Sequence, residues 1–410
     1  MVWIPGGGFS GGTTSLPVYD GARLAEKGVV LVSMAYRVGV FGFLAHPELS
    51  RESGSGSGNY GLLDMIAGLA WVRDNIAAFG GDPRNVTIFG VSAGGIAVSM
   101  LAASPAAKGL FARVIPESGG SFAPSTTSDQ GEQNVPILAL AESRGRAFLV
   151  KLAPSDIAAA RALPADVIQK AQGGGWGTFW PVDDGVVLPG DQYVLHSQGR
   201  FNDTPVLVGS NSDEGAYFMS DGVTSAGFEQ QMRAYYGDHA GRILAVNPHA
   251  TDAEALQAAR DVFRDSGFGW PTWTWARLQS RKGRGAAYVY YFDHRTPQSP
   301  NGAWHSDEIA YVFRNLGASG FRNRGAPGPA PRPEDVAMSE LVSSYWINFA
   351  KSGDPNGPGL PRWPTFTEQN QQVMFLDAAP SARPVPNLPQ LEALDAFYAS
   401  RRLEPADDAR

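Results

Sequence analysis

Short apolar runs alternate along this chain with longer segments in which apolar residues recur at helical spacing. Four runs are continuous in hydrophobicity rather than alternating: Val2–Ile4, Val29–Met34, Val86–Phe89 and Val206–Gly209. Continuous hydrophobicity is typical of parallel strands that are covered on both faces. A fifth run, Ala287–Phe292, is richer in tyrosine, and Leu62–Phe79 carries apolar residues at positions 62, 66, 69, 72 and 76, as an amphipathic helix does. This alternation predicts an α/β fold with a doubly wound, mostly parallel central sheet and helices on both faces.

The segments between and after these elements predict insertions and loops around the sheet. The length of 410 residues fits a single domain, residues 1–410, that carries insertions. Helical patches and aromatic residues place two insertions at about 125–205 and 220–285, and we expect them to form a lid and pocket walls over the functional site. Composition also predicts a flexible loop at 51–59, a proline-rich surface loop at 320–334 before a final helix near Met338–Lys351, and a frayed tail at 402–410.

The segment Gly90–Gly94 (GVSAG) joins an apolar run to a helical pattern of small residues. That is the layout of a nucleophile elbow, a sharp turn between strand and helix that exposes one serine hydroxyl. Glycine at both ends permits the turn and a close approach of strand and helix, and the helix N-terminus directs free amides toward the serine. A second match, Gly8–Gly12, carries Ser10 but is followed by a turn-rich stretch without helical period. Ser92 is therefore the candidate nucleophile, and Ser10 is not.

The amino-acid composition limits which kinds of site and which binding partners the chain can have. The chain has no cysteine, which excludes disulfides, thiolate metal sites and cysteine nucleophiles. Its net charge is −7 and its densest basic cluster is Arg281–Arg284, so nucleic-acid and anionic-membrane partners are disfavoured. No apolar run is long enough to span a membrane, and no signal peptide is visible at the start, MVWIPGGG. The compartment stays open between the cytoplasm and, if a signal peptide lies upstream, secretion; the oligomeric state is equally open.

A serine nucleophile needs a histidine base that is itself oriented by an acid, and in α/β-hydrolases the chain order is serine, acid, histidine. Asp213 and Glu214 follow the run Val206–Gly209, where such an acid is expected. His294 ends the tyrosine-rich strand and His305 lies in the loop beyond it. These residues alone do not decide which of the two is the base. Two other histidines, in polar helical surroundings, are expected at the surface: His239 and His249.

A series of ordered blocks extends the serine motif across most of the chain: WIPGGGFSGG, VSMAYRVGVFGFL, NYGLLDMIAGLAWVRDNIAAFGGDPRNVTIFGVSAGG, VGSNSDEG, YYFDHR, GAWHSDEIAYVF and FAKSGDPN. From Val2 to about Asn370 the chain thereby resembles the type-B carboxylesterase family, which includes the cholinesterases and has the α/β-hydrolase fold. The resemblance implies that Glu214 is the triad acid and His305 the base, with Ser92 as nucleophile. It makes His294 a structural residue.

The glycine loop after the first strand gains a role from the same resemblance. No Lys-Ser/Thr pair follows Gly6–Gly8, which excludes a phosphate-binding P-loop. The family pattern implies that an oxyanion is held by three backbone amides, those of Gly7, Gly8 and Ala93, each typically worth about 10²–10³-fold in rate. Ser118 and Glu308 would lie behind the triad, although an ordinary structural role is equally open for both. No metal and no organic cofactor are implied.

Three features depart from the family pattern. The segment of about a hundred residues that precedes the WIxGGG strand in the family is missing, so we expect either a truncated sequence or a natural short form with an open site and a bare sheet edge. Val91 stands where the family usually has glutamate, which predicts a less negative, more apolar site and weaker affinity for cationic alcohols. Pro5 stands where histidine or tyrosine is common, and it fixes φ and removes an amide.

Together these features predict a serine hydrolase that cleaves carboxylic esters through an acyl-enzyme intermediate with a Ser-His-Glu triad. The expected substrate is a small ester with an apolar or aromatic group. Aromatic residues that would line its pocket, or else belong to the core, are Trp176, Phe179, Trp180, Phe218 and the stripe Trp270, Trp273 and Trp275. Two alternatives remain: a catalytically weak or silent family member that binds a ligand or protein, and the same mechanism acting on an amide, lactone or polyester.

Overall fold

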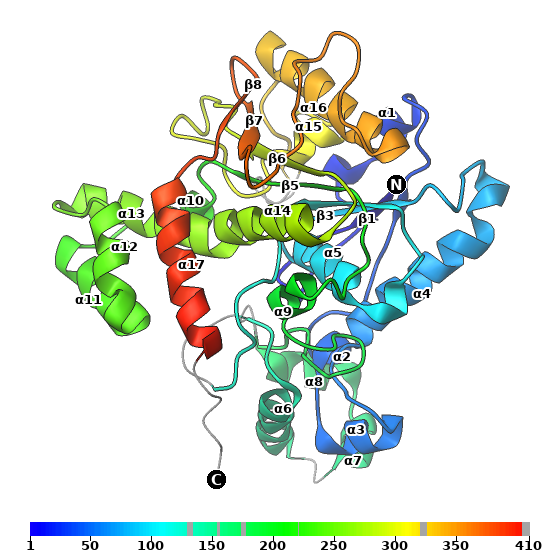
Figure 1. The fold of residues 1–410 in the computed structure, drawn as a ribbon. Helices are drawn as coiled ribbons and strands as arrows, with labels where there is room; N and C mark the ends of the chain where they lie inside the picture. Colours follow the sequence, from blue (N-terminus) through cyan, green and yellow to red (C-terminus); the bar gives the residue numbers. More distant parts are fainter. Residues whose placement is uncertain (129–133, 154–155, 174–177, 220, 320–325, 404–410) are drawn as a thin grey trace.

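A mostly parallel sheet of eight strands runs through the centre of the described residues, which are 1–403 apart from 129–133, 154–155, 174–177, 220 and 320–325 of this computed structural model. Helices cover both of its faces (Figure 1). The spatial order is β2-β1-β3-β4-β5-β6-β7-β8, and only β7 and β8 are antiparallel. The strands are β1 (Val2–Ile4), β2 (Val32–Ser33), β3 (Thr87–Val91), β4 (Arg113–Glu117), β5 (Val206–Asn211), β6 (Ala287–Phe292), β7 (Gln372–Leu376) and β8 (Ser381–Pro384).

The continuous apolar runs became the buried central strands. β1 and β6 have the predicted bounds, while β3 and β5 each extend two residues further toward their carboxyl ends. The run Val29–Met34 was too long a prediction, because only Val32–Ser33 pair with β1. Three strands were not predicted. β4 reads RVIPE and carries charges at both ends, and β7 and β8 lie at the sheet edge, where the hydrophobic signal is weaker.

Two apolar cores separate the sheet from its helices. The larger core packs β-strand side chains against α4 (Tyr60–Asn75), α5 (Ala93–Ala103), α9 (Gln192–Ser197), α14 (Trp270–Lys282) and α17 (Leu388–Leu403). The other core packs the opposite face against α1 (Ala22–Ala25), α15 (Ile309–Val312) and α16 (Pro333–Ser352). In Figure 1 the second group lies above the sheet and the first below it. The doubly wound α/β prediction is confirmed.

The remaining helices form two groups at the periphery of the sheet. One comprises α2 (Gly39–Phe43), α3 (Pro47–Ser53), α6 (Leu138–Leu152), α7 (Ile157–Arg161) and α8 (Ala165–Gln172). The other comprises α10 (Gly215–Phe218), α11 (Ser225–Tyr236), α12 (Ala240–Val246) and α13 (Asp252–Arg264), which a π-helical turn at Asp265–Gly269 joins to α14. Of these, α6, α7 and α8 lie within residues 125–205 and α11, α12 and α13 within residues 220–285, while α2, α3 and α10 lie outside both ranges. α14, also within 220–285, packs on β5 and β6 and so belongs to the layer of helices that covers the sheet.

Some local predictions need correction. Residues 51–53 were predicted as loop but complete α3, which begins at a proline after the cap His46. α16 starts five residues before the predicted Met338, and it is not the final helix because α17 follows. Arg402 belongs to α17 rather than to a tail, while 404–410 lie outside the described residues. No helix in the described part of the chain is long and apolar enough to cross a membrane.

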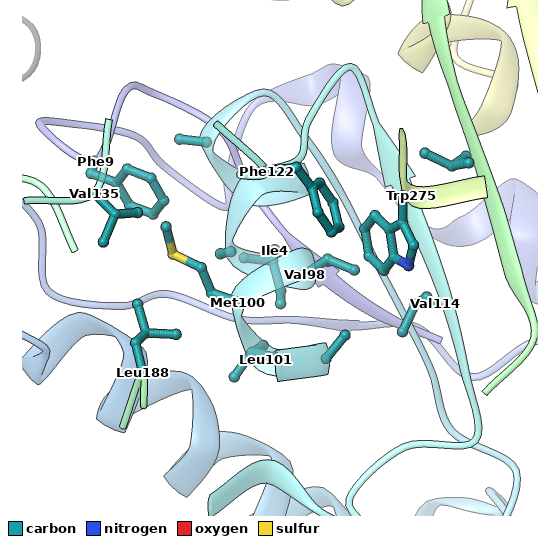
Figure 2. Close-up of a cluster of buried hydrophobic side chains, with 14 of the residues drawn as sticks. Ile4, Phe9, Val98, Met100, Leu101, Val114, Phe122, Val135, Leu188 and Trp275 are labelled. Carbon is teal, nitrogen blue, oxygen red and sulfur yellow. The ribbon is translucent and has the colours of Figure 1, made fainter. Parts of the chain in front are cut away.

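The helix after the serine motif lies almost wholly inside the larger core. All but one of the α5 residues are buried. Figure 2 shows Val98, Met100 and Leu101 of this helix between Phe9, Val135 and Leu188 on one side and Val114, Phe122 and Trp275 on the other. Because side chains of other elements pack around α5, Ser92 at its N-terminus has a fixed position.

Candidate active site

Four functional segments meet at one edge of the sheet. Because β1, β3, β5 and β6 are parallel, their carboxyl ends lie at the same edge, where ligands bind in open α/β sheets. Gly6–Gly8 follow β1, Ser92 follows β3, Glu214 follows β5, and His305 lies in the loop after β6. Residues that are far apart in the sequence are thereby brought together by the strand order.

Ser92 has the strained backbone of a nucleophile elbow. Its φ of 58° and ψ of −125° lie in a region that non-glycine residues rarely adopt, at a typical cost of about 1–3 kcal/mol. Two backbone hydrogen bonds hold it there: its N–H donates to the Glu117 carbonyl at 2.9 Å, and its carbonyl accepts from Ile96 at 2.8 Å. The strain turns the chain directly from β3 into α5 and leaves the side chain at the helix N-terminus.

Glycines let the elbow and the end of β1 touch. A Cβ placed on Gly94 would lie 2.0 Å from the carbonyl oxygen of Ile4, and one on Gly90 would lie 2.4 Å from that same atom. A Cβ on Gly6 would lie 2.7 Å from the carbonyl oxygen of Val91. No other residue fits these contacts, so the glycine loop is held against the serine.

The predicted amide donors lie on these two touching segments. Gly7 and Gly8 have φ values of 129° and 60°, which side chains disfavour. Ala93 is the first residue of α5, where amides have no acceptor inside the helix and the dipole favours negative charge. Gly8, Ala93 and Ser92 line one cavity. Two of the three residues predicted to supply these amides therefore border the same cavity as Ser92.

Ser10 lacks that setting. It lies in a turn, its amide donates to the Gly7 carbonyl at 3.1 Å, and its hydroxyl donates to the Gly8 carbonyl at 3.2 Å. No helix starts at this serine. The second Gly-x-Ser-x-Gly match therefore supports the glycine loop rather than presenting a nucleophile.

His305 is held against a buried carboxylate. Its Nδ1 lies 2.5 Å from Oε2 of Glu214, and both side chains are buried. The other oxygen, Oε1, accepts from the hydroxyl of Ser118 at 2.5 Å and from the amide of Asn211 at 2.8 Å. The carboxyl group of Glu214 is thus in hydrogen-bond contact with three groups. Ser118 has the contact with the acid that the sequence suggested.

The other acid and the other histidine lie elsewhere. Asp213 makes no hydrogen bond to either histidine in the described structure, and its Oδ1 is buried without a partner. Burial, followed by the negative charges of neighbouring carboxylates, raises the pKa of Asp213 to about 6. His294 pairs instead with Asp335, at 2.7 Å between Nε2 and Oδ1. His239 and His249 are partly exposed, the first in the helical turn Gly237–His239 and the second in the loop between α12 and α13.

Ser92 opens onto an apolar cavity of about 410 Å³. Trp180 and Phe218, both predicted as pocket residues, line it. Phe218 and Phe268 also contact His305, at ring-centroid distances of 5.0 and 4.8 Å, and the Phe268 ring is stacked on the imidazole. No hydrogen bond joins the described side chains of Ser92 and His305. The imidazole of His305 is held by Glu214 on one side and by the rings of Phe218 on α10 and Phe268 on the π-helical turn.

The other described residues that were predicted for the pocket do not line this cavity. Trp176 lies outside the described residues. Phe179 is buried against Phe148, with their ring centroids 5.1 Å apart, and it borders a different cavity. Three tryptophans of α14 are buried in the larger core: Trp270, Trp273 and Trp275. Pocket wall and core could not be separated from sequence because both are aromatic, and neighbours far along the chain decide which one a residue joins.

Sequence reasoning missed one acid, Glu117, at the end of β4. It is fully buried, and its Oε1 accepts from the indole N–H of Trp346 at 2.6 Å. Glu308, predicted as a second residue behind the triad, is also fully buried, and its Oε2 accepts from the side-chain amide of Asn211. The signal available was a glutamate directly before Ser118, at the end of the short apolar run 114–116. Val91 pairs with Glu117 on the neighbouring strand. The face of the sheet on which Val91 replaces the family's usual glutamate therefore still carries a carboxyl group, that of Glu117.

The site contains no clustered metal ligands. Within the described residues, no group of three or more histidine, aspartate or glutamate side chains is placed to hold a metal ion. The polar groups at the site are those of a serine, a histidine and hydrogen-bonded carboxyl groups. Such groups are able to act as a nucleophile and as an acid or base.

The chain is similar in sequence and in structure to known proteins. The sequence model of the carboxylesterase family matches residues 1–394. Fumonisin B1 esterase from Sphingopyxis macrogoltabida is 37% identical over 388 residues, which cover 92% of this chain and 69% of the relative. Para-nitrobenzyl esterase from Bacillus subtilis (strain 168) is 33% identical over 412 residues, covering 98% of this chain and 79% of the relative. A solved PNB esterase superposes with a TM-score of 0.81 at 33% identity, covering 96% and 79% of the two chains.

Proposed function

The chain belongs to the carboxylesterase family and is a carboxylic-ester hydrolase, and we propose that it works through an acyl-enzyme formed on Ser92. The observation that carries this proposal is the pairing of His305 with the buried, triply hydrogen-bonded Glu214 beside the strained elbow. A strained nucleophile next to an oriented base is the arrangement of serine hydrolases on unrelated folds. Ester hydrolysis is common to the family, while the residues that perform it here are the subject of the proposal.

In the first half-reaction, His305 takes the proton of the Ser92 hydroxyl as the serine oxygen bonds to the ester carbonyl carbon. Glu214 fixes the tautomer with Nδ1 protonated, so that Nε2 is free to accept the proton, and it stabilises the imidazolium that forms. His305 then protonates the alcohol oxygen as the ester C–O bond breaks, and the acyl group stays on Ser92. We expect substrate binding to bring the Ser92 hydroxyl and Nε2 of His305 within hydrogen-bond distance.

The negative charge that develops on the carbonyl oxygen needs donors that are already in place. We propose that the amides of Gly7, Gly8 and Ala93 supply them, because they lie on the two segments that touch at the serine. Such donors act mainly in the transition state and need no reorganisation. Water then attacks the acyl-enzyme by the same steps in reverse, with His305 as its base.

The cavity supports an apolar substrate. It is lined mainly by aromatic and aliphatic side chains, and its non-aromatic polar side chains besides Ser92 are Ser121, Asn134, Gln231 and Ser266. A volume of about 410 Å³ is within the range of small-ligand pockets. We therefore propose small esters with an apolar or aromatic acyl or alcohol group as substrates.

The second Gly-x-Ser-x-Gly segment provides a matched control for the test. We expect Ser92→Ala to lower kcat/KM for p-nitrophenyl esters by about 10⁴-fold or more, because the nucleophile is removed. Ser10→Ala should retain hydrolysis, because that hydroxyl only caps a turn. Rates are to be measured over a series of acyl chain lengths. If the Ser92→Ala protein hydrolysed esters like the wild type, or if neither protein did, the proposal would be wrong.

A further inference from the structure

Four residues form a row across the sheet behind the triad. Val91 on β3 pairs with Glu117 on β4, Glu117 pairs with Gly209 on β5, and Gly209 pairs with Tyr290 on β6. Paired residues of neighbouring strands point to the same face, here the face covered by α16. A Cβ on Gly209 would lie 2.3 Å from the Tyr290 ring. The missing side chain thus lets this ring lie across β5, on the side of Glu117.

Polar atoms in this row are buried without partners. Within the described structure, Oε2 of Glu117, Oε1 of Glu308 and the hydroxyl of Tyr290 have no hydrogen-bond partner. Glu117 and Glu308 are 0% exposed and Tyr290 is 1% exposed. An ionised carboxylate can only accept hydrogen bonds, and burying such a charge without compensation is costly. Two ionised glutamates would lack sufficient donors here.

The three glutamates behind Ser92 differ in their donors. Glu214 accepts three hydrogen bonds, whereas Glu117 and Glu308 each accept one from a side chain. None of the three is paired with a lysine or arginine of the described residues, and the single cationic partner available is His305. The hydrogen bonds in this cluster are sufficient to stabilise one negative charge. Because most of them are made to Glu214, the charge is most stable there.

We propose that Glu117 and Glu308 are positioning residues that carry protons at neutral pH, so that Glu214 alone is ionised and its charge faces His305. The proposal rests on the proposed function for its catalytic meaning, but not for its protonation states. Ionisation of Glu117 would add a buried negative charge next to the elbow, since its carbonyl accepts the Ser92 amide. That charge would oppose the oxyanion in the transition state.

The electrostatics of the cluster agree with this geometry. Burial raises the pKa of Glu117 to about 8, against an opposing hydrogen bond from Trp346. Burial, and then the nearby Glu117 and Glu214, raise the pKa of Glu308 well above its ordinary range. The other titratable groups that face the pair are Tyr19 before α1 and Tyr290 on β6, whose pKa values burial and these same carboxyl groups raise. The α16 partner, Trp346, does not titrate.

The first test follows stability against pH. An acid that keeps its proton to higher pH in the folded state makes the protein lose stability as pH rises between the two pKa values. For Glu117 that window runs from its ordinary value of 4.5 to about 8. Relative to wild type, Glu117→Gln should therefore become more stable as pH rises, with the ratio of unfolding constants changing by up to about tenfold per pH unit. Exposed Glu392 gives the control Glu392→Gln, which should show no such trend.

The second test reads the protons directly. In infrared spectra at neutral pH, Glu117→Gln and Glu308→Gln should each remove intensity from the protonated-carboxyl band, and Glu392→Gln should remove none. In esterase assays, wild-type kcat/KM should fall as pH rises through about 8, and Glu117→Gln should extend the plateau. If Glu117→Gln does not fold, Glu308→Gln carries the infrared test.

An unchanged infrared band, together with a stability difference that is constant with pH, would show that the glutamates are ionised and would overturn the proposal. The unfolding and infrared experiments need no turnover. If Ser92→Ala shows that the protein does not use this serine, the proposed mechanism fails while the protonation states can still be confirmed.

Discussion

Two buried histidine–carboxylate pairs lie close together in this protein, and they differ in what else the carboxylate binds. His305 contacts Glu214 at 2.5 Å and His294 contacts Asp335 at 2.7 Å. Both histidines border a second cavity of about 220 Å³. Asp335, however, also accepts two hydrogen bonds from the guanidinium of Arg332, at 2.7 and 3.0 Å. Glu214 receives its other hydrogen bonds from uncharged donors.

Two histidine–carboxylate pairs of similar geometry can therefore have different roles, one structural and one catalytic. Burial alone would raise the pKa of Asp335, but hydrogen bonds from Arg332 and His294 outweigh it and hold the pKa below its ordinary range. Its charge is neutralised by arginine at the start of α16, and so the pair ties the loop after β6 to that helix. The charge of Glu214 has no cation of the described residues except His305 when protonated. That is the condition under which a carboxylate stabilises a transient imidazolium.

Replacing the two histidines should give the largest contrast. We expect His305→Asn to lower kcat/KM by about 10⁴–10⁶-fold, because loss of the base disables the serine. His294→Asn should keep kcat/KM close to wild type but lower the urea midpoint, because it breaks a buried pair. Steady-state ester hydrolysis and urea denaturation of both variants check this. Equal activity loss in both variants would mean that the two pairs are not functionally distinct.

Replacing the two acids should give a smaller contrast of the same kind. Glu214→Gln is expected to lower kcat by about 10³–10⁴-fold, since an amide can favour the wrong tautomer of His305. Asp335→Asn should instead change the pH dependence of stability. An acid with a depressed pKa in the folded state stabilises the protein above its unfolded pKa and loses that effect as pH falls through the folded value.

For Asp335 that loss begins below about pH 4, because its ordinary pKa is 3.8. Wild type should therefore lose stability on acidification more steeply than Asp335→Asn, which urea titrations at several pH values can measure. Parallel curves for the two proteins would show that Asp335 does not carry this ionic contribution.

Much of the fold and the position of the nucleophile could be predicted from sequence because their determinants are local. Continuous apolar runs marked β1, β3, β5 and β6, and the glycine pattern at Ser92 reflects close contacts that only glycine permits. β4 was missed because arginine, proline and glutamate interrupt it. Its carboxyl-terminal Glu117 is buried, which a local pattern cannot indicate.

The partners of each polar group were harder to predict because they depend on long-range contacts. His294 and His305 are eleven positions apart, and only the resemblance to the family separated them. The structure places Glu214 and Asp335 beside them from elements 91 and 41 residues away. In the same way, Phe179 and Trp180 are neighbours in sequence, yet only Trp180 reaches the cavity at Ser92. Packing between distant segments decides such cases.

The central claim, that Ser92 is the nucleophile activated by His305, is tested most directly by covalent trapping. Wild-type protein is treated with a fluorophosphonate and analysed by intact mass and peptide mapping, beside Ser92→Ala, Ser10→Ala and His305→Asn. We predict one phosphonyl group on Ser92 in the wild type and in Ser10→Ala, none in Ser92→Ala, and much slower labelling in His305→Asn. Labelling at another residue, or wild-type labelling rates in His305→Asn, would contradict the account.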